Sequence, residues 1–480
     1  MALRWVVRPN AYYDSVKLMR VSDTLSGLDG VERAAAVMAT PLNRDLLADD
    51  GLLPPEVEAA PDDLLVAVLG RDEQAAGDAL ARLDDLLQLR RRQTDSEETL
   101  APPTIEAALD VAASNLAVIA VPGPYAAAEA FAALRRNLHV FLFSDNVPLA
   151  EEIRLKRLAA ELDLLMMGPD CGTAIIGGVG LGFANRVERG PVGIVGASGT
   201  GIQQVSSLLD AAGIGIAQAI GTGGRDLSSK VGGSMTRRAV AALKADSTVE
   251  IVVVISKPAD ERTALRLHRD LLKLRKPAVV CLLGTELQDE GTIRYADNLT
   301  EAASVVADIA GAPTDAWRGP EYRGRRGDTG LKVYGLFSGG TLCTEAARAL
   351  DAMDARHSML DLGADEYTQG RAHPMIDPRL RASMIADLRG QDDAGAVLLD
   401  VVLGDLAHPD PAGVLLPALA ELDASRTGSS PRAFVSLIGT RRDPQGLAEQ
   451  RAKLEDAGAL VFASNVEAAR AAGRAIGAGE

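Results

Sequence analysis

Two Ser/Gly-rich turns contain the residues of this chain that are best suited to chemistry. The first, Ser198–Gly201, follows an apolar run within VGIVGASGTGIQQVSSLLDAAG (192–213) and opens a helical pattern. The first N–H groups of a helix have no intrahelical partner, and the helix dipole adds positive charge there, so such a start binds anions. Glycine allows the ligand to approach closely, and Ser or Thr adds hydroxyl donors. Alternatively, Ser198 or Thr200 only caps the helix.

A second turn repeats this arrangement. VYGLFSGGTLCTEAARALDAMD (333–354) has the same order of apolar strand, Ser-Gly-rich turn with Thr, and helix. Each half also has a later apolar strand, ending near Lys257-Pro258 and near Gly404-Asp405. The two halves therefore look like variants of one flavodoxin-like unit. If both helix starts aimed at one point, they would form a two-sided phosphate cradle. The predicted phosphate-binding residues are Ser198, Gly199, Thr200, Gly201, Ser338, Gly339, Gly340 and Thr341.

Further candidates lie in two His-containing segments. YTQGRAHPMIDP (367–378) brings Arg371, His373 and Asp377 into a predicted loop. Histidine can act as an acid or base near neutral pH, and arginine can clamp a carboxylate or phosphate. A histidine bracketed by prolines can also be only a structural hydrogen bonder. His408 in GDLAHPDP is a further candidate. Both segments are expected just past strands of the last domain, where ligands bind in open α/β sheets.

Composition and charge limit the classes of function. The chain has 480 residues, enough for about three domains. Its formal charge of −16 disfavours nucleic acid, whose phosphate backbone demands a basic face. No apolar run reaches the length of a membrane span, and the N-terminus MALRWVVRPN lacks the pattern of a secretory signal. The three cysteines have no metal-ligand spacing, so no metal is predicted. We expect a cytoplasmic protein that binds no membrane.

The elements that must position these residues alternate between strand-like and helix-like segments almost throughout. Such alternation is typical of βαβ units and parallel sheets. The early strands are expected at 3–7, 34–39 and 64–70. The polar and then Pro-rich stretch TDSEETLAPP (94–103) indicates a domain boundary. The predicted fold class is α/β, with several doubly wound Rossmann- or flavodoxin-like parallel-sheet domains.

The pair of turns resembles the succinyl-CoA synthetase superfamily, in which helices of two sister domains point their N-termini at a phosphorylated group. The similarity runs through GPDCGTAI…VGIVGASGTG…AIGTGGRDL…IVVVISKP (168–258), which resembles the ligase region of the α subunit. It continues through GLFSGGTLCTEA…MLDLGADE…VLLDVVLGD (335–405), which resembles the C-terminal domain of the β subunit. This order, together with YYDSVKLMRVSDTLSGLDGVERAAAVMATPLNRDLL (12–47) and DEYTQGRAHPMIDP (365–378), identifies the chain as a member of the FdrA family.

The resemblance implies a division into domains. We expect an N-terminal α/β module at 1–98, a CoA-binding-like Rossmann-type domain at 99–188, an α-subunit-like ligase domain at 189–312, a linker at 313–330 and a β-subunit-like flavodoxin-type domain at 331–480.

Departures from the synthetases bear directly on mechanism. The segment that matches their phosphohistidine loop reads GTELQDEGTIRYADN (284–298) and has no histidine. Lys257 stands where the synthetases have the glutamate that steadies the histidine, and a cation there suits direct neutralisation of a phosphate. Lys257 can also be an ordinary strand-end lysine. No ATP-grasp domain, phosphate-binding P-loop or early CoA-binding glycine loop is recognisable. Cys171 matches the cysteine of the synthetases' Gly-Pro-Asn-Cys turn, but nothing nearby indicates an activated thiolate.

Three functions stay open at this point. The resemblance implies, first, an FdrA-like subunit of oxamate carbamoyltransferase, which would convert oxalurate and phosphate to oxamate and carbamoyl phosphate in purine-ureide (allantoin) degradation. Lys257, His373 and Arg371 would then be the catalytic residues. The second is an ADP-forming acyl-CoA synthetase that uses CoA and ATP or ADP with a partner nucleotide subunit. The third is a non-catalytic scaffold or sensor subunit. We expect small-molecule substrates, partner subunits in a complex and a homo-oligomer.

Overall fold

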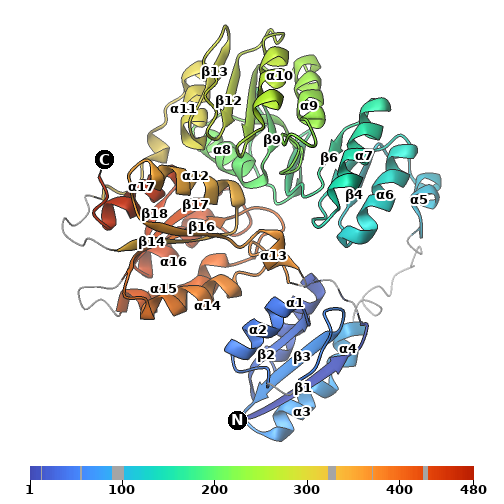
Figure 1. The fold of residues 1–480 in the computed structure, drawn as a ribbon, viewed down its shortest axis with the longest axis vertical. Coiled ribbons are helices and arrows are strands. Elements are labelled where there is room, and N and C mark those ends of the chain that lie inside the picture. The colour runs from blue at the N-terminus through green and yellow to red at the C-terminus, as the bar shows by residue number, and fades with distance from the viewer. Residues whose placement is uncertain are drawn as a thin grey trace. The chain divides into compact units, whose positions relative to one another are not determined.

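The computed structural model describes residues 1–11, 13, 15–54, 57–88, 102–322, 331–369, 371–424 and 431–479 (Figure 1). The boundary predicted between residues 98 and 99 and the second part of the predicted linker lie outside these residues. The chain forms two compact units. The first comprises Met1–Ala108 with Ala364–Asp377, and the second comprises Leu109–Gly363 with Pro378–Glu480. None of the described helices combines the length and apolar character that a membrane span requires.

The first unit is built on a three-stranded sheet of order β1-β3-β2. Its elements are β1 (Ala2–Arg8), α1 (Ser15–Ser26), β2 (Val31–Met38), α2 (Pro41–Asp49), β3 (Leu64–Gly70), α3 (Glu73–Ala81), α4 (Leu83–Gln88) and α13 (Asp365–Thr368). The central strand β3 is apolar throughout because its two faces pack into two separate cores. Val66 faces a core with α1 and α3, and Leu65 faces one with α2.

Pairing in this first sheet differs from the parallel arrangement that the alternation predicted. Strand β3 is antiparallel to both neighbours, with Val66 opposite Val6 on β1 and opposite Ala36 on β2. The edge strands β1 and β2 still run in the same direction and are joined across α1, as in a split βαβ unit. The alternation of strand and helix predicts the connection from β1 through α1 to a parallel β2. It carries no information that the later strand β3 inserts between β1 and β2.

A small parallel sheet of order β4-β5-β6 begins the second unit. Its elements are β4 (Leu116–Ile119), α6 (Gly123–Arg135), β5 (His139–Leu142), α7 (Leu149–Glu161) and β6 (Met166–Met167), and α5 (Ile105–Val111) precedes them.

The next sheet has seven strands in the order β13-β12-β11-β9-β10-β7-β8. The elements are β7 (Thr173–Ile176), β8 (Val179–Gly182), β9 (Val192–Ala197), α8 (Gly199–Ala211), β10 (Ile216–Gly221), α9 (Ser234–Ala245), β11 (Ile251–Ser256), α10 (Glu261–Leu271), β12 (Ala278–Leu282), β13 (Ile293–Tyr295) and α11 (Leu299–Ala310). Strands β9 to β13 are parallel and follow the flavodoxin-like order 2-1-3-4-5. The antiparallel pair β7-β8 extends one edge.

The last sheet has the order β15-β14-β16-β17-β18 and is parallel throughout. Its elements are β14 (Lys332–Phe337), α12 (Gly340–Asp351), β15 (His357–Asp361), α14 (Arg379–Asp387), β16 (Ala394–Val402), α15 (Pro411–Ala424), β17 (Arg432–Ile438), α16 (Leu447–Asp456), β18 (Leu460–Phe462) and α17 (Asn465–Ala475), with short 3-10 turns at Asp315–Trp317 and Leu388–Gly390. Counted from β14, the order is again 2-1-3-4-5. The predicted repeat of one flavodoxin-like unit is therefore confirmed.

Buried polar contacts join the two large sheets within the second unit. The Asn185 side-chain amide donates to Asp443 Oδ2 at 2.7 Å and to the Leu403 carbonyl at 2.9 Å. On α8, Gln204 Nε2 donates to the Ala463 carbonyl at 2.9 Å. Because these contacts are directional and those of Asn185 are buried, they set how α8 meets the second sheet.

Candidate functional site

The first predicted turn lies where β9 passes into α8. Ser198 has an extended backbone and caps the helix, since its Oγ accepts a hydrogen bond from the Gly201 N–H at 2.9 Å. The capping interpretation of Ser198 is therefore confirmed. Gly199 and Thr200 contribute the other first-turn N–H groups, which have no intrahelical acceptor. Because β9 and β11 adjoin at the switch point of the sheet, this turn occupies the usual place for a ligand in such folds.

The structure brings the second turn directly against the first. Ser198 Oγ donates to Thr341 Oγ1 at 2.7 Å, although the two residues are far apart in the sequence. A Cβ atom on Gly339 would lie 2.6 Å from Thr200 Oγ1, so a side chain there would push the helix starts apart. Glycine at position 339 thus permits α8 and α12 to begin side by side. The predicted cradle residues are neighbours in space.

Lys257 joins this pair of helix starts. It follows β11, and its Nζ lies 3.7 Å from Asp361 Oδ2 at the end of β15. A Cβ atom on Gly340 would overlap both Lys257 Nζ and Asp361 Oδ2, so both groups lie against the first turn of α12. Burial raises the pKa of Asp361, and the Lys257 ammonium opposes that shift. The Lys257 side chain is 41% exposed, so it is both near the turn and within reach of solvent.

The second turn already holds an internal anion. The Asp400 carboxylate accepts from the Ser338 N–H at 2.8 Å, the Ser338 hydroxyl at 2.9 Å and the Gly339 N–H at 2.8 Å. Arg381 donates to Asp400 Oδ1 at 2.8 Å, and both side chains are fully buried. Ser338 and Gly339 were predicted to donate to a phosphate, but their N–H groups donate to Asp400 instead. Gly340 and Thr341 supply the remaining first-turn N–H groups of α12.

Sequence reasoning missed Asp400, Arg381 and Asp361. The available signal was an aspartate inside the apolar run AVLLDVVLG, because a carboxylate in a buried strand needs hydrogen-bond partners. The partners themselves were not visible, since Ser338 and Arg381 come from segments that pack around β16 only in the folded chain.

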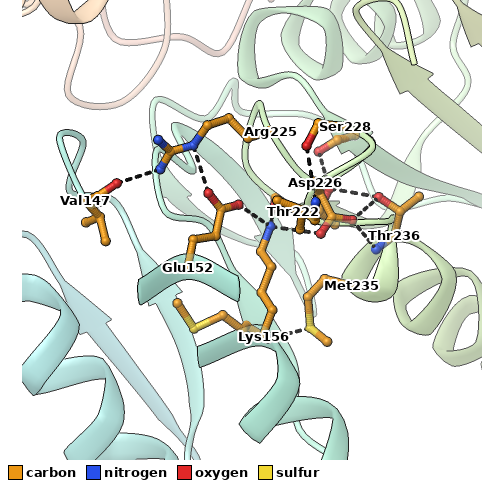
Figure 2. A network of polar contacts seen from close by, with 12 residues as sticks. Val147, Glu152, Lys156, Thr222, Arg225, Asp226, Ser228, Met235 and Thr236 are labelled. Atoms are coloured by element: carbon orange, nitrogen blue, oxygen red, sulfur yellow. Dashed lines mark hydrogen bonds and ion pairs between the residues drawn. The ribbon is translucent and has the colours of Figure 1, made fainter. Parts of the chain in front are cut away.

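A buried charged network, also missed, fixes the loop that follows β10 (Figure 2). Lys156 on α7 donates to Glu152 Oε1 at 2.8 Å, to Asp226 Oδ1 at 2.8 Å and to the Thr222 carbonyl at 2.9 Å. The other oxygen of Asp226 accepts from the N–H and the hydroxyl of Thr236 at the start of α9. Arg225 Nε approaches Glu152 Oε2 at 2.8 Å. This network ties the Gly-Thr-Gly-Gly-Arg-Asp loop to the small sheet domain through α7.

Cys171 lies beside that loop but is not reactive. It is 2% exposed, and its thiol lies 3.6 Å from the Thr173 carbonyl. Burial raises the pKa of the Cys171 thiol to about 12, so the thiolate is not available near neutral pH. Cys343 on α12 is similar, because burial raises its pKa to about 12 as well. Both cysteines pack the structure around the turns.

Arg371, His373 and Asp377 lie in a different place from the one expected. Residues Ala364–Asp377 group with the first unit, and not with the last sheet that precedes and follows them in the sequence. Arg371 Nε donates to Asn43 Oδ1 of α2 at 3.2 Å. His373 stabilises its own turn, since its Nδ1 accepts from the Met375 N–H at 3.2 Å. The side chains of Ala372 and Met375 in this segment are buried.

His408 follows β16 in the second unit, as expected. Its Nδ1 accepts from the Asp410 N–H at 3.0 Å, and its carbonyl accepts from Gln445 Nε2 at 3.3 Å. These contacts are those of a turn that leads into α15. The loop 284–298 is held by a histidine from outside it: His268 on α10 contacts Glu290 Oε2 at 2.8 Å and the Tyr295 hydroxyl at 2.9 Å.

Three family models match the chain. The model described as "AllF, heavy metal-associated domain" matches residues 1–102. The "CoA binding domain" model matches residues 187–269, in the seven-stranded sheet, whereas the CoA-binding-like domain was predicted at 99–188. The "CoA-ligase" model matches residues 336–475, in the last sheet. Both turns of the candidate site lie within the last two matched regions.

Individual relatives show similarity to the same kinds of domain. Succinate–CoA ligase (ADP-forming) subunit alpha of Staphylococcus epidermidis is 27% identical over 35% of this chain and 57% of its own length. The chain therefore spans little more than half of that relative. An apo acetyl-coenzyme A synthetase 1 structure from Ca. Korarchaeum cryptofilum is 15% identical, covering 78% of this chain and 84% of that one, with a TM-score of 0.32.

The uncharacterized protein YahF of Escherichia coli K12 is 37% identical over 97% of this chain and 97% of its own. The match extends through the N-terminal domain and both ligase-like domains. The chain thus belongs to the FdrA family of succinyl-CoA synthetase-like proteins.

Proposed function

We propose that this chain is a subunit of a transferase that handles an acyl phosphate, and specifically of an oxamate carbamoyltransferase. The reaction is oxalurate plus phosphate to oxamate plus carbamoyl phosphate. The observation that carries the proposal is the convergence of the α8 and α12 starts beside Lys257 Nζ. The absence of histidine from residues 284–298 supports it, because that segment then offers no phosphoryl carrier.

Electrostatics makes this arrangement suitable for a phosphate. Each helix start contributes about half a unit of positive charge, worth about 0.3–1 kcal/mol when exposed and up to about 2 kcal/mol when partly buried. The Lys257 ammonium adds a full charge beside the N–H group of Gly340. At this turn the backbone N–H groups that donate to Asp400 are those of Ser338 and Gly339, which precede α12, so the N–H groups of Gly340 and Thr341 are left for a phosphate. The phosphate therefore binds to the N–H groups of Gly199, Thr200, Gly340 and Thr341.

The chemistry follows from that placement. An oxygen of hydrogen phosphate attacks the carbamoyl carbon of oxalurate, and the bond from that carbon to the amide nitrogen breaks. The proton of the hydrogen phosphate ends on the departing nitrogen, so oxamate leaves as the neutral amide. Lys257 holds the phosphate, and helix-start N–H groups stabilise the charge that develops as the bond breaks. Asp361, whose pKa burial raises, relays the proton.

The proposal is tested with the purified chain, alone and together with the products of neighbouring genes. We expect phosphate-dependent conversion of oxalurate to carbamoyl phosphate only when partner subunits are present. Phosphate labelled with ¹⁸O should place its label in the bridging oxygen of carbamoyl phosphate. Full-rate turnover by the chain alone would contradict the need for partners, and an unlabelled bridging oxygen would contradict the proposed attack.

A second candidate is an acid–CoA ligase that works with a partner nucleotide subunit. The matches to CoA-binding and CoA-ligase domains favour it. The same assay distinguishes the two, because the ligase makes an acyl-CoA in a reaction that depends on CoA and ATP. If acyl-CoA formed and oxalurate were untouched, the ligase would replace the carbamoyltransferase.

The two candidates also differ in phosphorylation. We predict that incubation with γ-labelled ATP or a labelled acyl phosphate leaves no acid-labile, base-stable label on the chain. The reason is that residues 284–298 contain no histidine, and His268, the neighbour of that loop, is engaged by Glu290 and Tyr295. Peptide mapping of the labelled protein checks this. A stoichiometric label on any of the five histidines would restore the ligase interpretation.

Anion binding should depend on pH through Asp361. Burial raises the pKa of this carboxyl above its ordinary value of 3.8. Above that raised pKa the carboxylate is charged and repels a bound anion, and below it the repulsion is lost. Sulfate affinity should therefore rise as the pH falls toward 3.8. Sulfate is the probe because it keeps its double charge over this range. In Asp361→Asn the dependence should disappear, and an unchanged slope in that variant would exclude Asp361 from the site.

A further inference from the structure

The N-terminal domain matches a family described as heavy metal-associated, yet its own residues do not fit a heavy metal. Soft metal ions are held in proteins by thiolate, thioether and imidazole ligands. Residues 1–102 contain no cysteine and no histidine, since the first histidine is His139 and the first cysteine is Cys171. Thioethers are present only in Met1, Met19 and Met38, of which Met1 is exposed and Met38 is buried in the hydrophobic core. Within the described part of the chain, no group of three or more His, Cys, Asp or Glu side chains could hold a metal ion.

The N-terminal domain packs with a distant segment of the same chain, Ala364–Asp377. In the sequence, this segment connects β15 to α14 of the last sheet domain, but it packs with the first unit. Its side chains Ala372 and Met375 are 7% and 4% exposed, as in a core. This burial, together with the grouping of the segment with the first unit, indicates that the segment is a packed part of the fold and not a surface loop.

A fixed polar contact accompanies that burial. Asn43 on α2 is fully buried, and its Nδ2 donates to the Met38 carbonyl at 2.9 Å. That bond orients the amide so that Asn43 Oδ1 accepts from Arg371 Nε at 3.2 Å. Asn43 Oδ1 is held in place by the domain itself, and the Arg371 guanidinium comes from the distant segment. Their hydrogen bond therefore fixes the segment at a specific position on α2.

We propose that the N-terminal domain has exchanged metal ligation for a docking surface on α2, and that its ligand is the chain's own segment Ala364–Asp377. Arg371 is the positioning residue of this attachment. The segment begins directly after the turn in which the Gly363 N–H donates to Asp361 Oδ1 at 3.2 Å, so docking limits the freedom of the chain that follows Asp361. The inference does not depend on the proposed carbamoyl transfer, since it concerns only packing and metal ligation.

Hydrogen–deuterium exchange of the full chain tests the docking. In Arg371→Ala, amides of residues 364–377 should exchange at least tenfold faster than in the natural protein, and amides of α2 should follow. Asn43→Ala should give the same local change. Arg389→Ala, which removes an exposed arginine whose ion-pair partner Glu421 lies outside the segment, is the matched control and should leave this region unchanged. Unchanged exchange at 364–377 in both Arg371→Ala and Asn43→Ala, with circular dichroism showing folded protein, would overturn the proposal.

The metal arm uses Zn²⁺ and Cu⁺ as probes on the chelator-treated full chain. We expect no stoichiometric binding that slows exchange within residues 1–102. Protection confined to that region, or a metal-dependent rise in its stability, would overturn the loss of metal ligation. Hydrogen–deuterium exchange shows which residues a metal protects. Metal bound by Cys171, Cys281 or Cys343 after opening of the second unit would therefore be distinguished from metal bound within residues 1–102.

Discussion

Replacing Gly340 with aspartate is expected to lower the affinity for phosphate by a factor on the order of 100 or more. The new side chain would project onto Lys257 Nζ, because a Cβ atom at this position already overlaps that group. The carboxylate would therefore take the place of the anion. Loss of a charge-assisted contact costs about 1.5–3 kcal/mol, and repulsion at a helix start adds up to about 2 kcal/mol. Titration calorimetry with phosphate measures the result.

Gly199→Asp gives an independent version of this experiment at the other helix start. A Cβ atom on Gly199 would lie 3.2 Å from Thr173 Oγ1, so the backbone needs little adjustment. The matched controls are Gly199→Asn and Gly340→Asn, which have nearly the same volume without the charge. Each Asn variant should retain more affinity than its Asp counterpart, with circular dichroism confirming the fold. Unchanged phosphate affinity in both Asp variants would reduce the two turns to ordinary helix caps.

Lys156→Met is expected to lower the free energy of unfolding of the second unit by about 3–5 kcal/mol, because removing one partner of a buried ion pair leaves uncompensated charge. The ammonium lies between Glu152 and Asp226 (Figure 2). All three side chains are at most 2% exposed. Methionine keeps most of the volume, so the loss reports charge and hydrogen bonding more than packing. Denaturant unfolding, followed by a signal from the second unit, measures the change.

Lys230→Met is the matched control for this prediction. Lys230 lies in the same loop region but is exposed, so its replacement should change the free energy of unfolding by less than about 0.5 kcal/mol. If Lys156→Met were as mild as Lys230→Met, the network would not stabilise the loop after β10. A second variant, Asp226→Asn, should also be destabilising, since it weakens the contacts to Lys156 and to Thr236 from the opposite side.

The parts of the fold that depend on local pattern were predictable from the sequence. The alternation of strand-like and helix-like segments indicated parallel sheets, and strands such as β11 and β12 are buried along their whole length, as such sheets require. Each Ser-Gly-rich turn between a strand and a helix marked a carboxyl end of a strand, and the similar order of the two halves implied a shared topology. The flavodoxin-like order of both sheets follows that expectation.

The parts that depend on contacts between distant segments were not predictable. Asp400 binds Ser338 from another strand, and Lys156 meets Asp226 across two domains. Such pairs have no local signature, since each partner reads as an ordinary polar residue in its own segment. The grouping of Ala364–Asp377 with the N-terminal domain is of the same kind. In the candidate site, the two turns and Lys257 were identified, whereas Asp361 was not.

The most direct test of the central claim is a crystal of the chain soaked in arsenate, with the anomalous signal of arsenic marking the anion. The account predicts a peak between the starts of α8 and α12, at a distance of about 3 Å from Lys257 Nζ to the nearest arsenate oxygen. The N–H groups of Gly199 and Gly340 should donate to the same ion. A well-occupied arsenate elsewhere in the molecule, with no anomalous density between these two helix starts, would contradict it.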